Sequence, residues 1–333
     1  MMKQPKKVGL LTGGYTSEYE VSIKSAKNVV EKLHPGRFET YVIYITPEEW
    51  YYQPVDGQRI RVNKEDFSIQ LNGQQITFDV IFICIHGSPG EDGKLQAYFD
   101  LLRIPYTSCK QLASAITMNK FYTKAVLSDL AELHIAPSVL LVDALTAQHV
   151  LEEASLIYPL FVKPNNGGSS IGLSKITAPD QIDEALRKAF QEDPGNQVIA
   201  EEFIAGRELS VGVFRFTDEI TVLPPSEVVL QADYFDFQTK YNSPGTIDIT
   251  PADLTDDESS RIQRVAKHIF TRLGCKGVVR IDFILQHETG LLHLLEINTI
   301  PGQTDSSFVP KQLRAAGIDV SHFFSQLIDE ALI

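Results

Sequence analysis

Cysteine is scarce in this sequence of 333 residues, which contains only Cys84, Cys109 and Cys275. The three cysteines are far apart and odd in number, and none takes part in a C-x-x-C or Cys/His spacing that would indicate a zinc site. A disulfide framework is therefore excluded as the basis of the fold. Scattered cysteines are typical of a cytoplasmic protein, in which the thiols stay reduced and are buried.

Positive charge and long apolar runs are also in short supply. The chain has 30 Lys and Arg against 43 Asp and Glu, so its net charge is −13. Nucleic acids and anionic membranes select basic surfaces, so neither is an expected partner, although a few local lysines could still bind a small anion. The longest apolar run, Val80 to Ile85, is too short to cross a bilayer, and the N-terminal stretch lacks the apolar core of a signal peptide. We therefore expect a cytoplasmic protein.

The composition that is present, 43% hydrophobic and 22% charged, is that of a globular protein with a packed core. In the first third, apolar strands over residues 7–12, 37–46 and 79–85 alternate with helical stretches, and hairpins are expected within residues 50–77. This pattern predicts an N-terminal α/β domain, residues 1–117, with a doubly wound parallel sheet. Ligands of such sheets bind beyond the carboxyl ends of the strands, where Gly13-Gly14 and His86-Gly87 lie.

The rest of the chain is predicted to be α+β, divided into a central unit of residues 118–207 and a C-terminal unit of residues 208–333. A helical stretch is expected from Thr117 to Leu133, and a loop from Asp233 to Thr250. Two segments have the spacing of a capping box, in which side chains satisfy the free amides of a helix start: residues 17–20 and 255–258. Gly274 is expected to end the second of these helices.

A predicted hairpin near the C-terminus carries a strong chemical signal. Alternation places Arg280 and Asp282 on one face of the first strand, and Glu296 and Asn298 on one face of the second. Folding about Thr289 brings Asp282 opposite Glu296. The other face is expected to be buried through its apolar residues: Ile281, Phe283, Leu295 and Ile297. Two carboxylates and a carboxamide suit Mg²⁺ bound partly through phosphates, although a solvated polar face would have the same pattern.

The stretch FVKPNNGGSSIG, residues 161–172, predicts a loop that binds an anion. Lys163 ends a strand, and residues 167–170 offer successive backbone amides and hydroxyls that could fold over an anion as a lid. The lysine precedes the glycines, so this is not a Walker A loop, and a plain connecting loop is the alternative interpretation.

Two further groups of residues could serve a nucleotide. Lys120 is a candidate second phosphate ligand, although a lone lysine on a helix is usually solvated. Glu201 and Glu208 flank the apolar pair Phe203-Ile204. Together, the four residues offer what a purine and a ribose require: hydrogen bonds to the base edge, an apolar slot and a carboxylate for the hydroxyls. On its own, Glu201-Glu202 would be interpreted as a surface charge pair.

In their order along the chain, these strings resemble the motifs of the D-alanine–D-alanine ligase family of the ATP-grasp superfamily. The resemblance covers nearly the whole length and rests on GGYTSEYEVS, HGSPGEDG, MNK, KPNNGGSSIG, EEFIAGRE, FDFQTKY, RIDF and LEINTIPGQTDSSF. It implies an ATP-grasp architecture, in which the N-terminal domain is followed by two α+β subdomains that sandwich ATP. It also implies a homodimer formed through the N-terminal domain. The implied activity joins two D-alanine molecules through an acyl phosphate, for the synthesis of peptidoglycan precursors.

The resemblance implies roles for individual residues in binding ATP and metal. Lys120 and Lys163 would hold the phosphates, Glu201 the adenine amino group and Glu208 the ribose. The full set of implied ATP-binding positions is Lys120, Lys163, Gly168, Ser169, Ser170, Glu201, Glu202, Phe203, Ile204, Glu208 and Lys240. Two Mg²⁺ ions, or Mn²⁺ in their place, would be held by Asp282, Glu296 and Asn298.

The two D-alanine sites follow from the same resemblance. The first D-alanine would give its ammonium to Glu18, near His86, and its carboxylate to Arg280 and the amide of Gly302. The second would be held by Ser307 and Lys240. Catalytic roles are implied for Glu18, Ser169, Tyr241, Arg280 and Ser307, of which Glu18, Ser169 and Tyr241 would lock the glycine-rich loop shut.

Several of these positions have structural alternatives. Glu18 could serve only the helix dipole, His86 could be a loop histidine, and Ser307 could cap the following helix. Glu91, in HGSPGEDG, is expected to belong to a turn without a chemical role.

The sequence departs from the family pattern at Tyr19, Asn119, Gly167 and Phe308, the last beside the acceptor serine. A D-lactate or D-serine acceptor, or another carboxylate–amine ligase, therefore stays open, although Tyr241 after Lys240 favours an amine acceptor. An NAD-binding oxidoreductase is disfavoured because the chain lacks G-x-G-x-x-G in the required context. A non-catalytic nucleotide-binding protein is disfavoured because no phosphate or metal position is missing.

Overall fold

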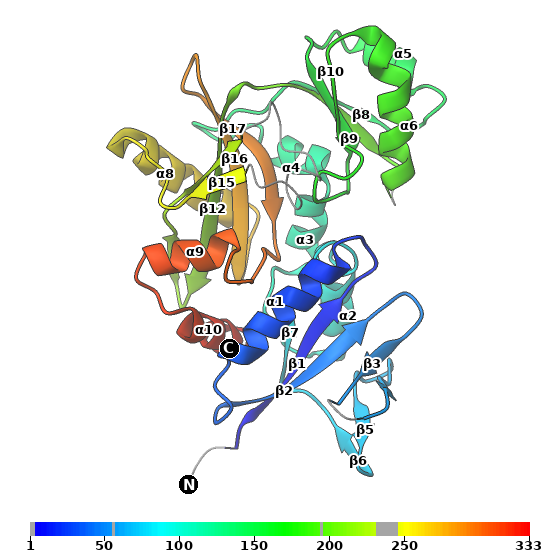
Figure 1. The fold of residues 1–333 in the computed structure, drawn as a ribbon, viewed down its shortest axis with the longest axis vertical. Coiled ribbons are helices and arrows are strands. Elements are labelled where there is room, and N and C mark those ends of the chain that lie inside the picture. The colour runs from blue at the N-terminus through cyan, green and yellow to red at the C-terminus, as the bar shows by residue number, and fades with distance from the viewer. Residues whose placement is uncertain (1–3, 55–56, 194–195, 231–245) are drawn as a thin grey trace.

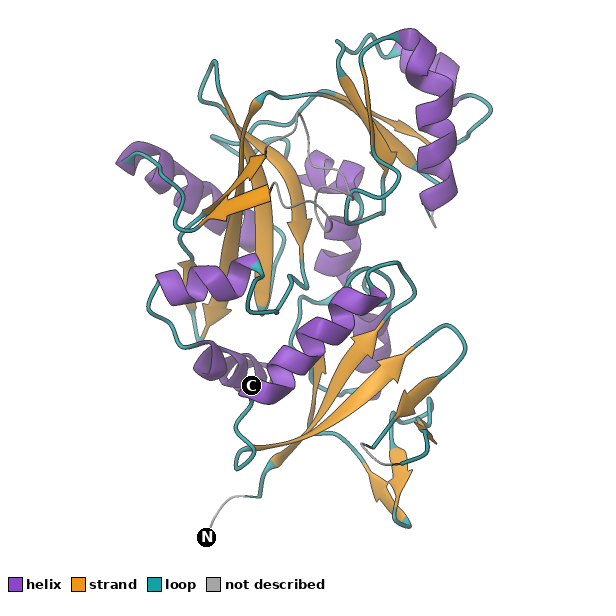
Figure 2. Ribbon diagram, viewed as in Figure 1, coloured by secondary structure: helices purple, strands orange, loops and turns teal. Residues whose placement is uncertain are grey.

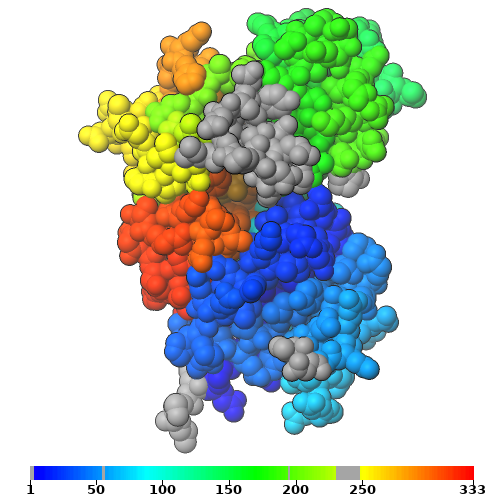
Figure 3. All heavy atoms as spheres, in the orientation of Figure 1, coloured from blue at the N-terminus to red at the C-terminus, as the bar shows by residue number. Residues whose placement is uncertain are grey.

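The computed structural model describes residues 4–54, 57–193, 196–230 and 246–333. Within them, three main sheets follow one another along the chain, each packed against helices (Figures 1 and 2). Figure 3 shows the N-terminal residues in blue at the bottom, the central unit in green at the upper right and the C-terminal residues in yellow to red on the left. Among the described residues, no helix is long and apolar enough to span a membrane.

The first sheet has a parallel centre. Strand β1 (Lys6–Gly13) lies between β2 (Phe38–Ile45) and β7 (Val80–Ile83) and pairs in parallel with both. All of β7 is buried, as its continuous apolar run predicts. Beyond β2, the strands β3 (Trp50–Tyr52) and β4 (Ile60–Arg61) extend the sheet in antiparallel pairing. The predicted parallel sheet is therefore confirmed for β1, β2 and β7, and the antiparallel pair of β3 and β4 agrees with the hairpins expected within residues 50–77.

A predicted hairpin and a predicted helix cap accompany this sheet. Strands β5 (Ile69–Leu71) and β6 (Gln74–Ile76) pair around Asn72-Gly73, both with positive φ, which confirms the turn. Helices α1 (Tyr19–Lys32) and α2 (Lys94–Leu102) pack against the first sheet. The capping box predicted at residues 17–20 is wrong, because α1 begins after Glu18, which makes no side-chain cap. The Glu18 carboxylate instead reaches Ser169.

Two short helices replace the long one predicted from Thr117 to Leu133. Helix α3 (Gln111–Met118) ends at Asn119, and α4 (Lys120–Leu127) begins there. Asn119 has an extended backbone, and its side chain accepts a hydrogen bond from the Tyr122 amide at 3.0 Å, so it acts as a helix N-cap. This break places Lys120 in the first turn of α4.

The central sheet is antiparallel and is covered by helices on one face (Figure 2). Its strands, in spatial order, are β10 (Ser174–Ile176), β9 (Leu160–Pro164), β11 (Val198–Glu202) and β8 (Ser138–Leu141). The covering elements are α5 (Ala147–Glu153), the short 3-10 helix η1 (Pro179–Gln181) and α6 (Ile182–Glu192). The register pairs Ile199 of β11 with Lys163 of β9.

The C-terminal sheet is also antiparallel. Its strands run in the order β15 (Thr246–Ile249), β14 (Ser226–Leu230), β12 (Gly206–Phe216), β16 (Val278–Gln286) and β17 (Leu292–Asn298), with β13 (Glu219–Val222) paired to β12. The helices that follow or cover it are α8 (Asp256–Arg272), α9 (Phe308–Ala315) and α10 (Val320–Ala331). Strand β15 falls where a loop is predicted, and the remaining part of that stretch, residues 233–245, lies outside the described residues.

Both predicted ends of α8 are confirmed. The Thr255 side chain accepts from the Glu258 amide, and the Glu258 carboxylate accepts from the Thr255 amide at 2.8 Å. Gly274 follows the helix with a φ of +62°, a backbone conformation that glycine adopts without strain. These caps fix the length of the helix that covers the C-terminal sheet.

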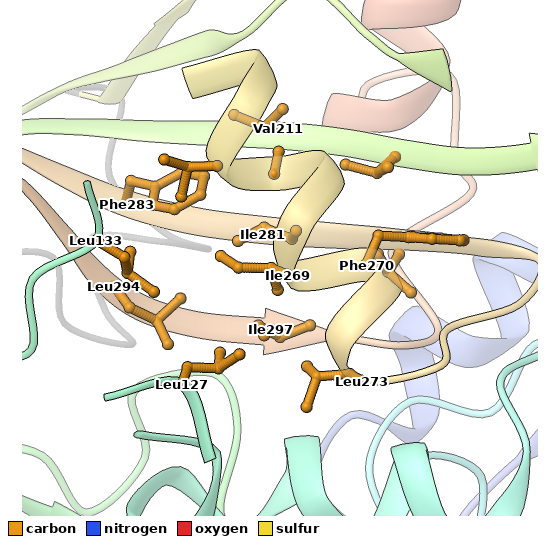
Figure 4. Close-up of a cluster of buried hydrophobic side chains, with 14 of the residues drawn as sticks. Leu127, Leu133, Val211, Ile269, Phe270, Leu273, Ile281, Phe283, Leu294 and Ile297 are labelled. Carbon is orange, nitrogen blue, oxygen red and sulfur yellow. The ribbon is translucent and has the colours of Figure 1, made fainter. Parts of the chain in front are cut away.

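A cluster of buried apolar side chains lies between α8 and the strands beneath it (Figure 4). Ile269 and Phe270 of α8 lie over Ile281 and Phe283 of β16, and Leu127, next to this core, comes from α4. The burial of Ile281, Phe283 and Ile297 is confirmed. The prediction for Leu295 is wrong, because a β-bulge shifts the register between Asp282 and Phe283 and brings Leu294 into the core instead.

Replacing Leu292 by alanine tests this core. Leu292 is fully buried, so we expect the free energy of unfolding to fall by roughly 2–5 kcal/mol through lost apolar burial and the cavity left behind. Urea unfolding followed by circular dichroism measures the loss. The matched control is Leu145→Ala, since Leu145 is 94% exposed, and its effect should stay within about 0.5 kcal/mol. Equal losses in the two variants would contradict the assigned core.

Candidate active site

A cavity of about 420 Å³ lies between the central and C-terminal sheets. It is lined by strands β9 and β11 on one side, by β12, β16 and β17 on the other, and by the glycine-rich loop. Most of the residues that the sequence assigns to ATP and metal line it: Lys120, Lys163, Gly168, Ser170, Glu201, Glu202, Phe203, Ile204, Glu208, Asp282 and Glu296. Arg280 also lines it. Segments far apart in the sequence therefore meet at one cavity.

The hairpin has the predicted register at its polar positions. Asp282 pairs with Glu296 and Arg280 with Asn298 across β16 and β17. The Asp282 carboxylate accepts from the Arg280 guanidinium at 2.7 and 2.9 Å and from the side-chain amide of Asn298 at 3.1 Å. Ser210 of β12 donates to the same carboxylate at 2.5 Å. Burial acts to lower the pKa of Arg280, but the Asp282 carboxylate outweighs it and raises that pKa overall.

The chemistry of these side chains fits a magnesium ion that takes further ligands from a substrate. Asp282, Glu296 and Asn298 offer hard oxygen donors on one face of the sheet. Among the described residues, no group of three or more His, Cys, Asp and Glu could hold a metal by itself. Mg²⁺ commonly binds one or two carboxylates and completes its shell with phosphate oxygens and water, so the donor set matches a metal–nucleotide complex.

Lys163 and Glu201 form a buried ion pair with a third partner that the sequence analysis missed. The Glu201 carboxylate accepts from Lys163 through Oε1 and from Lys124 of α4 through Oε2. Burial tends to raise the pKa of Glu201, but the two ammonium groups lower it to about 2. The predicted adenine ligand is thus occupied by two lysines here, and the surface-pair alternative is wrong because Glu201 is buried. The spacing of Lys124, four residues after Lys120 on one helix face, is the signal that could have found it.

Lys120 is buried rather than solvated. Its ammonium donates to the carbonyl of Gly167 and lies 3.7 Å from Glu296. Burial lowers the pKa of Lys120, and the Glu296 carboxylate opposes that effect. Lys120 therefore joins the glycine-rich loop to the carboxylates of the hairpin.

The glycine-rich loop contacts the N-terminal unit through Glu18. Ser169 donates to the Glu18 carboxylate at 2.5 Å, and a Cβ on Gly168 would lie 2.9 Å from the same carboxylate. Both Ser169 and Ser170 have positive φ, a strained conformation for residues with a side chain. A close approach of loop and carboxylate therefore explains the glycine and agrees with the predicted contact between Glu18 and Ser169. The third member of that set, Tyr241, lies outside the described residues, as does Lys240.

His86 is held by the structure on both sides of its ring. One nitrogen lies 3.0 Å from Ser25 Oγ and the other 2.8 Å from the carbonyl of Ile300. The ring is buried, which matches the structural alternative for this residue.

Ser307 and Gly302 lie in the segment that follows the hairpin. Ser307 occupies the N-cap position of α9, but its side chain makes no cap and instead lies 2.7 Å from the Thr304 hydroxyl. Neither residue lines the 420 Å³ cavity, whereas Phe308 does, with the Arg280 guanidinium 5.7 Å from its ring centre. Within this segment it is therefore Phe308, and not Ser307 or Gly302, that lines the cavity.

Glu91 has a role that the sequence analysis did not assign. Its carboxylate accepts from the Gly87 amide at 2.8 Å and from the Ile300 amide at 3.0 Å. It lines a second, small cavity of about 30 Å³ together with Glu18 and Asn298. Burial raises the pKa of Glu91 to about 7, and the nearby Glu18 carboxylate adds to the effect. Glu91 thus connects the loop after β7 to the segment after β17.

Across one cavity, lysines of the central sheet and of helix α4 lie opposite carboxylates of the C-terminal sheet. This is the arrangement of an ATP-grasp enzyme. Within this class, the chain belongs to the D-alanine–D-alanine ligase family. The family model described as "D-ala D-ala ligase N-terminus" matches residues 7–109, and that described as "D-ala D-ala ligase C-terminus" matches residues 132–329. The resemblance seen in the sequence is therefore confirmed.

Relatives cover almost the whole chain. A D-alanine–D-alanine ligase of Azobacteroides pseudotrichonymphae is 39% identical and covers 97% of this chain and 99% of its own. The crystal structure of VanG D-Ala:D-Ser ligase from Enterococcus faecalis has a TM-score of 0.86 at 32% identity and covers 98% of this chain and 100% of its own. The crystal structure of D-alanyl-alanine synthetase A from Vibrio cholerae also has a TM-score of 0.86, at 28% identity, and covers 99% of each chain.

The raised pKa of Glu91 predicts a pH dependence of stability. Between about pH 4.5 and pH 7 the folded protein keeps a proton on Glu91 that the unfolded chain loses. The contribution of this proton to the free energy of unfolding is therefore full below about pH 4.5 and falls as the pH rises to about 7. Glu91→Gln should remove that decline, measured as the melting temperature across this range. Glu20→Gln, at an exposed position of α1, is the control and should keep the wild-type slope. An unchanged slope in Glu91→Gln would assign the titration to another group.

Proposed function

We propose that this chain is an ATP-dependent enzyme that joins two D-alanine molecules into D-alanyl-D-alanine, for peptidoglycan precursor synthesis. The observation that carries the proposal is the single cavity at which the buried cations Lys120 and Lys163 face the hairpin residues Asp282 and Glu296. A triphosphate with its metal needs both kinds of charge at one place.

ATP would lie between the central and C-terminal sheets in this proposal. Lys120 and Lys163 bind its phosphates, residues 167–170 cover them, and Glu208 binds the ribose hydroxyls. Phe203, in edge contact with Phe161 at 5.5 Å, helps form the apolar wall for the base. Asp282, Glu296 and Asn298 hold Mg²⁺, which when bound neutralises the charge that develops on the phosphates.

The chemistry requires activation of a carboxylate, which is a poor electrophile because resonance stabilises its anion. A carboxylate oxygen of the first D-alanine attacks the γ-phosphorus, ADP leaves, and an acyl phosphate forms. The neutral amine of the second D-alanine then attacks the carbonyl carbon, and the amide forms with loss of a proton and phosphate. In this proposal Arg280 stabilises the tetrahedral oxyanion, and its hydrogen bonds to Asp282 orient the guanidinium. The amide of Gly302 is its proposed partner.

The substrates are assigned from the same family positions. Glu18 binds the ammonium of the first D-alanine beside His86, and Ser307 with Lys240 binds the carboxylate of the second. The contact of Ser169 with Glu18 supports a loop that closes over the site, with Tyr241 as a further member. Closure excludes water, which would otherwise hydrolyse the acyl phosphate.

A second candidate differs only in the acceptor. VanG of Enterococcus faecalis, 32% identical to this chain, is a D-Ala:D-Ser ligase, and Phe308 departs from the family pattern beside Ser307. D-serine is therefore the alternative acceptor to test alongside D-alanine.

We also retain as proposals the three units of residues 1–117, 118–207 and 208–333, a homodimer through the N-terminal unit, and a cytoplasmic location.

The activity itself is the first prediction of this proposal. Incubation with ATP, Mg²⁺ and D-alanine should release one ADP for each dipeptide, measured by a coupled assay and mass spectrometry. Parallel reactions with L-alanine, and with D-serine added to D-alanine, test the stereochemistry and the acceptor. ADP release without a dipeptide would reject the ligase, and a mixed D-Ala–D-Ser product in excess would select the second candidate.

Lys163→Ala tests the assignment of the phosphate site. Loss of a charge-assisted contact to phosphate should raise the KM for ATP by roughly tenfold or more. The KM for D-alanine should change less, because Lys163 lies in the cavity assigned to ATP. The control is Lys267→Ala, at an exposed position on α8. Unchanged kinetics in Lys163→Ala would remove this lysine from the site.

A further inference from the structure

Lys124 is a buried lysine to which neither the family motifs nor the proposed mechanism gives a role. It lies on α4, one helical turn after Lys120, and its side chain is only 4% exposed. Its ammonium donates to Glu201, whose side chain is equally buried. An ammonium is costly to bury, so this position requires a partner that offsets the desolvation.

The two oxygens of Glu201 have different partners. Oε2 accepts from Lys124 and Oε1 accepts from Lys163. Lys163 and Glu201 line the 420 Å³ cavity, as does Lys124. One carboxylate therefore serves two ammonium groups, of which only Lys163 has a proposed contact with phosphate.

We propose that Lys124 is a positioning residue for the nucleotide: it holds Glu201 through Oε2, so that Oε1 can pass from Lys163 to the exocyclic amine of adenine when ATP binds. This inference rests on the proposed function, because it assumes that Lys163 turns to the phosphates. Lys124 itself touches neither the base nor the phosphates.

The physical reason lies in the local charge balance. With Lys124 present, the Glu201 charge is already neutralised from one side, so Lys163 is held less strongly and can leave. Without Lys124, a desolvated carboxylate would face Lys163 alone, and in a medium of low dielectric that pair would resist separation. Lys163 would then be withheld from the phosphates, and Oε1 would be withheld from the adenine amine.

The test compares nucleotides that differ at the atom Glu201 is proposed to recognise. ATP and ADP carry an amine at C6 of the purine, whereas ITP and IDP carry an oxygen, which cannot donate to a carboxylate. In Lys124→Met, which keeps the length of the side chain without its charge, the ratio of ADP to IDP affinity should fall roughly tenfold. The KM for ATP should rise by a similar factor. Lys267→Met is the control at an exposed position and should keep the wild-type ratio.

Loss of a buried charge could also unfold the protein, so a second variant accompanies the first. Lys124→Gln removes the charge but keeps an amide that can donate to Glu201, so Glu201 and Lys163 stay paired in the buried site. This variant should be folded, judged by its melting temperature, and should also show a reduced ratio of ADP to IDP affinity. A purely structural lysine would weaken the binding of both nucleotides equally.

The outcomes separate this inference from the proposed function. Binding of ADP and IDP, measured by calorimetry, needs no turnover, so it reports on Lys124 even if no dipeptide forms. A wild-type ratio of ADP to IDP affinity in the folded Lys124 variants would overturn the inference, as would equal binding of ADP and IDP by the wild type. Absence of the dipeptide together with a reduced ratio in the variants would reject the ligase and retain the role of Lys124.

Discussion

The antiparallel pairing of β16 with β17 determines where charge and apolar surface lie in the C-terminal half. One face of the hairpin carries Asp282 opposite Glu296, and the other carries Ile281 and Ile297 beneath α8 (Figure 4). A slip of one residue would exchange the two faces, burying carboxylates under the helix and exposing the core. Burial of the apolar face therefore fixes the register, and the register in turn fixes the carboxylates at the cavity.

The charged groups at the cavity depend on one another. Lys163 is held by Glu201, Lys120 by the Gly167 carbonyl and the nearby Glu296, and Asp282 by Arg280. A buried charge without a partner costs several kcal/mol, so each group needs these contacts when no triphosphate is bound. Binding of ATP would then be an exchange of partners, in which phosphate oxygens and a metal replace contacts within the protein. Such an exchange conserves the charge balance and demands little change in the sheets.

Local patterns in the sequence were sufficient for some of these features and insufficient for others. The capping box at residues 255–258 and the pairing of Asp282 with Glu296 depend on neighbouring residues and on alternation, which the sequence displays. The bulge that turns Leu295 away from the core interrupts the alternation on which the prediction depended. The helix break at Asn119 is accompanied by contacts with a distant segment, since Asn165 accepts from the Lys120 and Phe121 amides. The proposed role of Lys124 requires α4 to bring this lysine to Glu201 of β11, and no local pattern contains that information.

Contacts with the segment of residues 299–303 explain why the N-terminal side of the site was the hardest to predict. The His86 ring binds the carbonyl of Ile300, Glu91 binds its amide, and Asn28 donates to the carbonyl of Gln303 at 2.6 Å. All three partners are backbone groups, which every residue type possesses, so the sequence of this segment gives no sign of them. These contacts hold the loop after β7 and helix α1, which begins after Glu18, against the end of the hairpin.

On the other side of the site, the glycine-rich loop reaches Glu18 through Ser169, whose positive φ is a strained backbone conformation. Strain of this kind persists only while the contacts around it are kept. The side of the site formed by α1 and the loop after β7 is therefore held by backbone groups, whereas the position of the glycine-rich loop depends on the contact between Ser169 and Glu18.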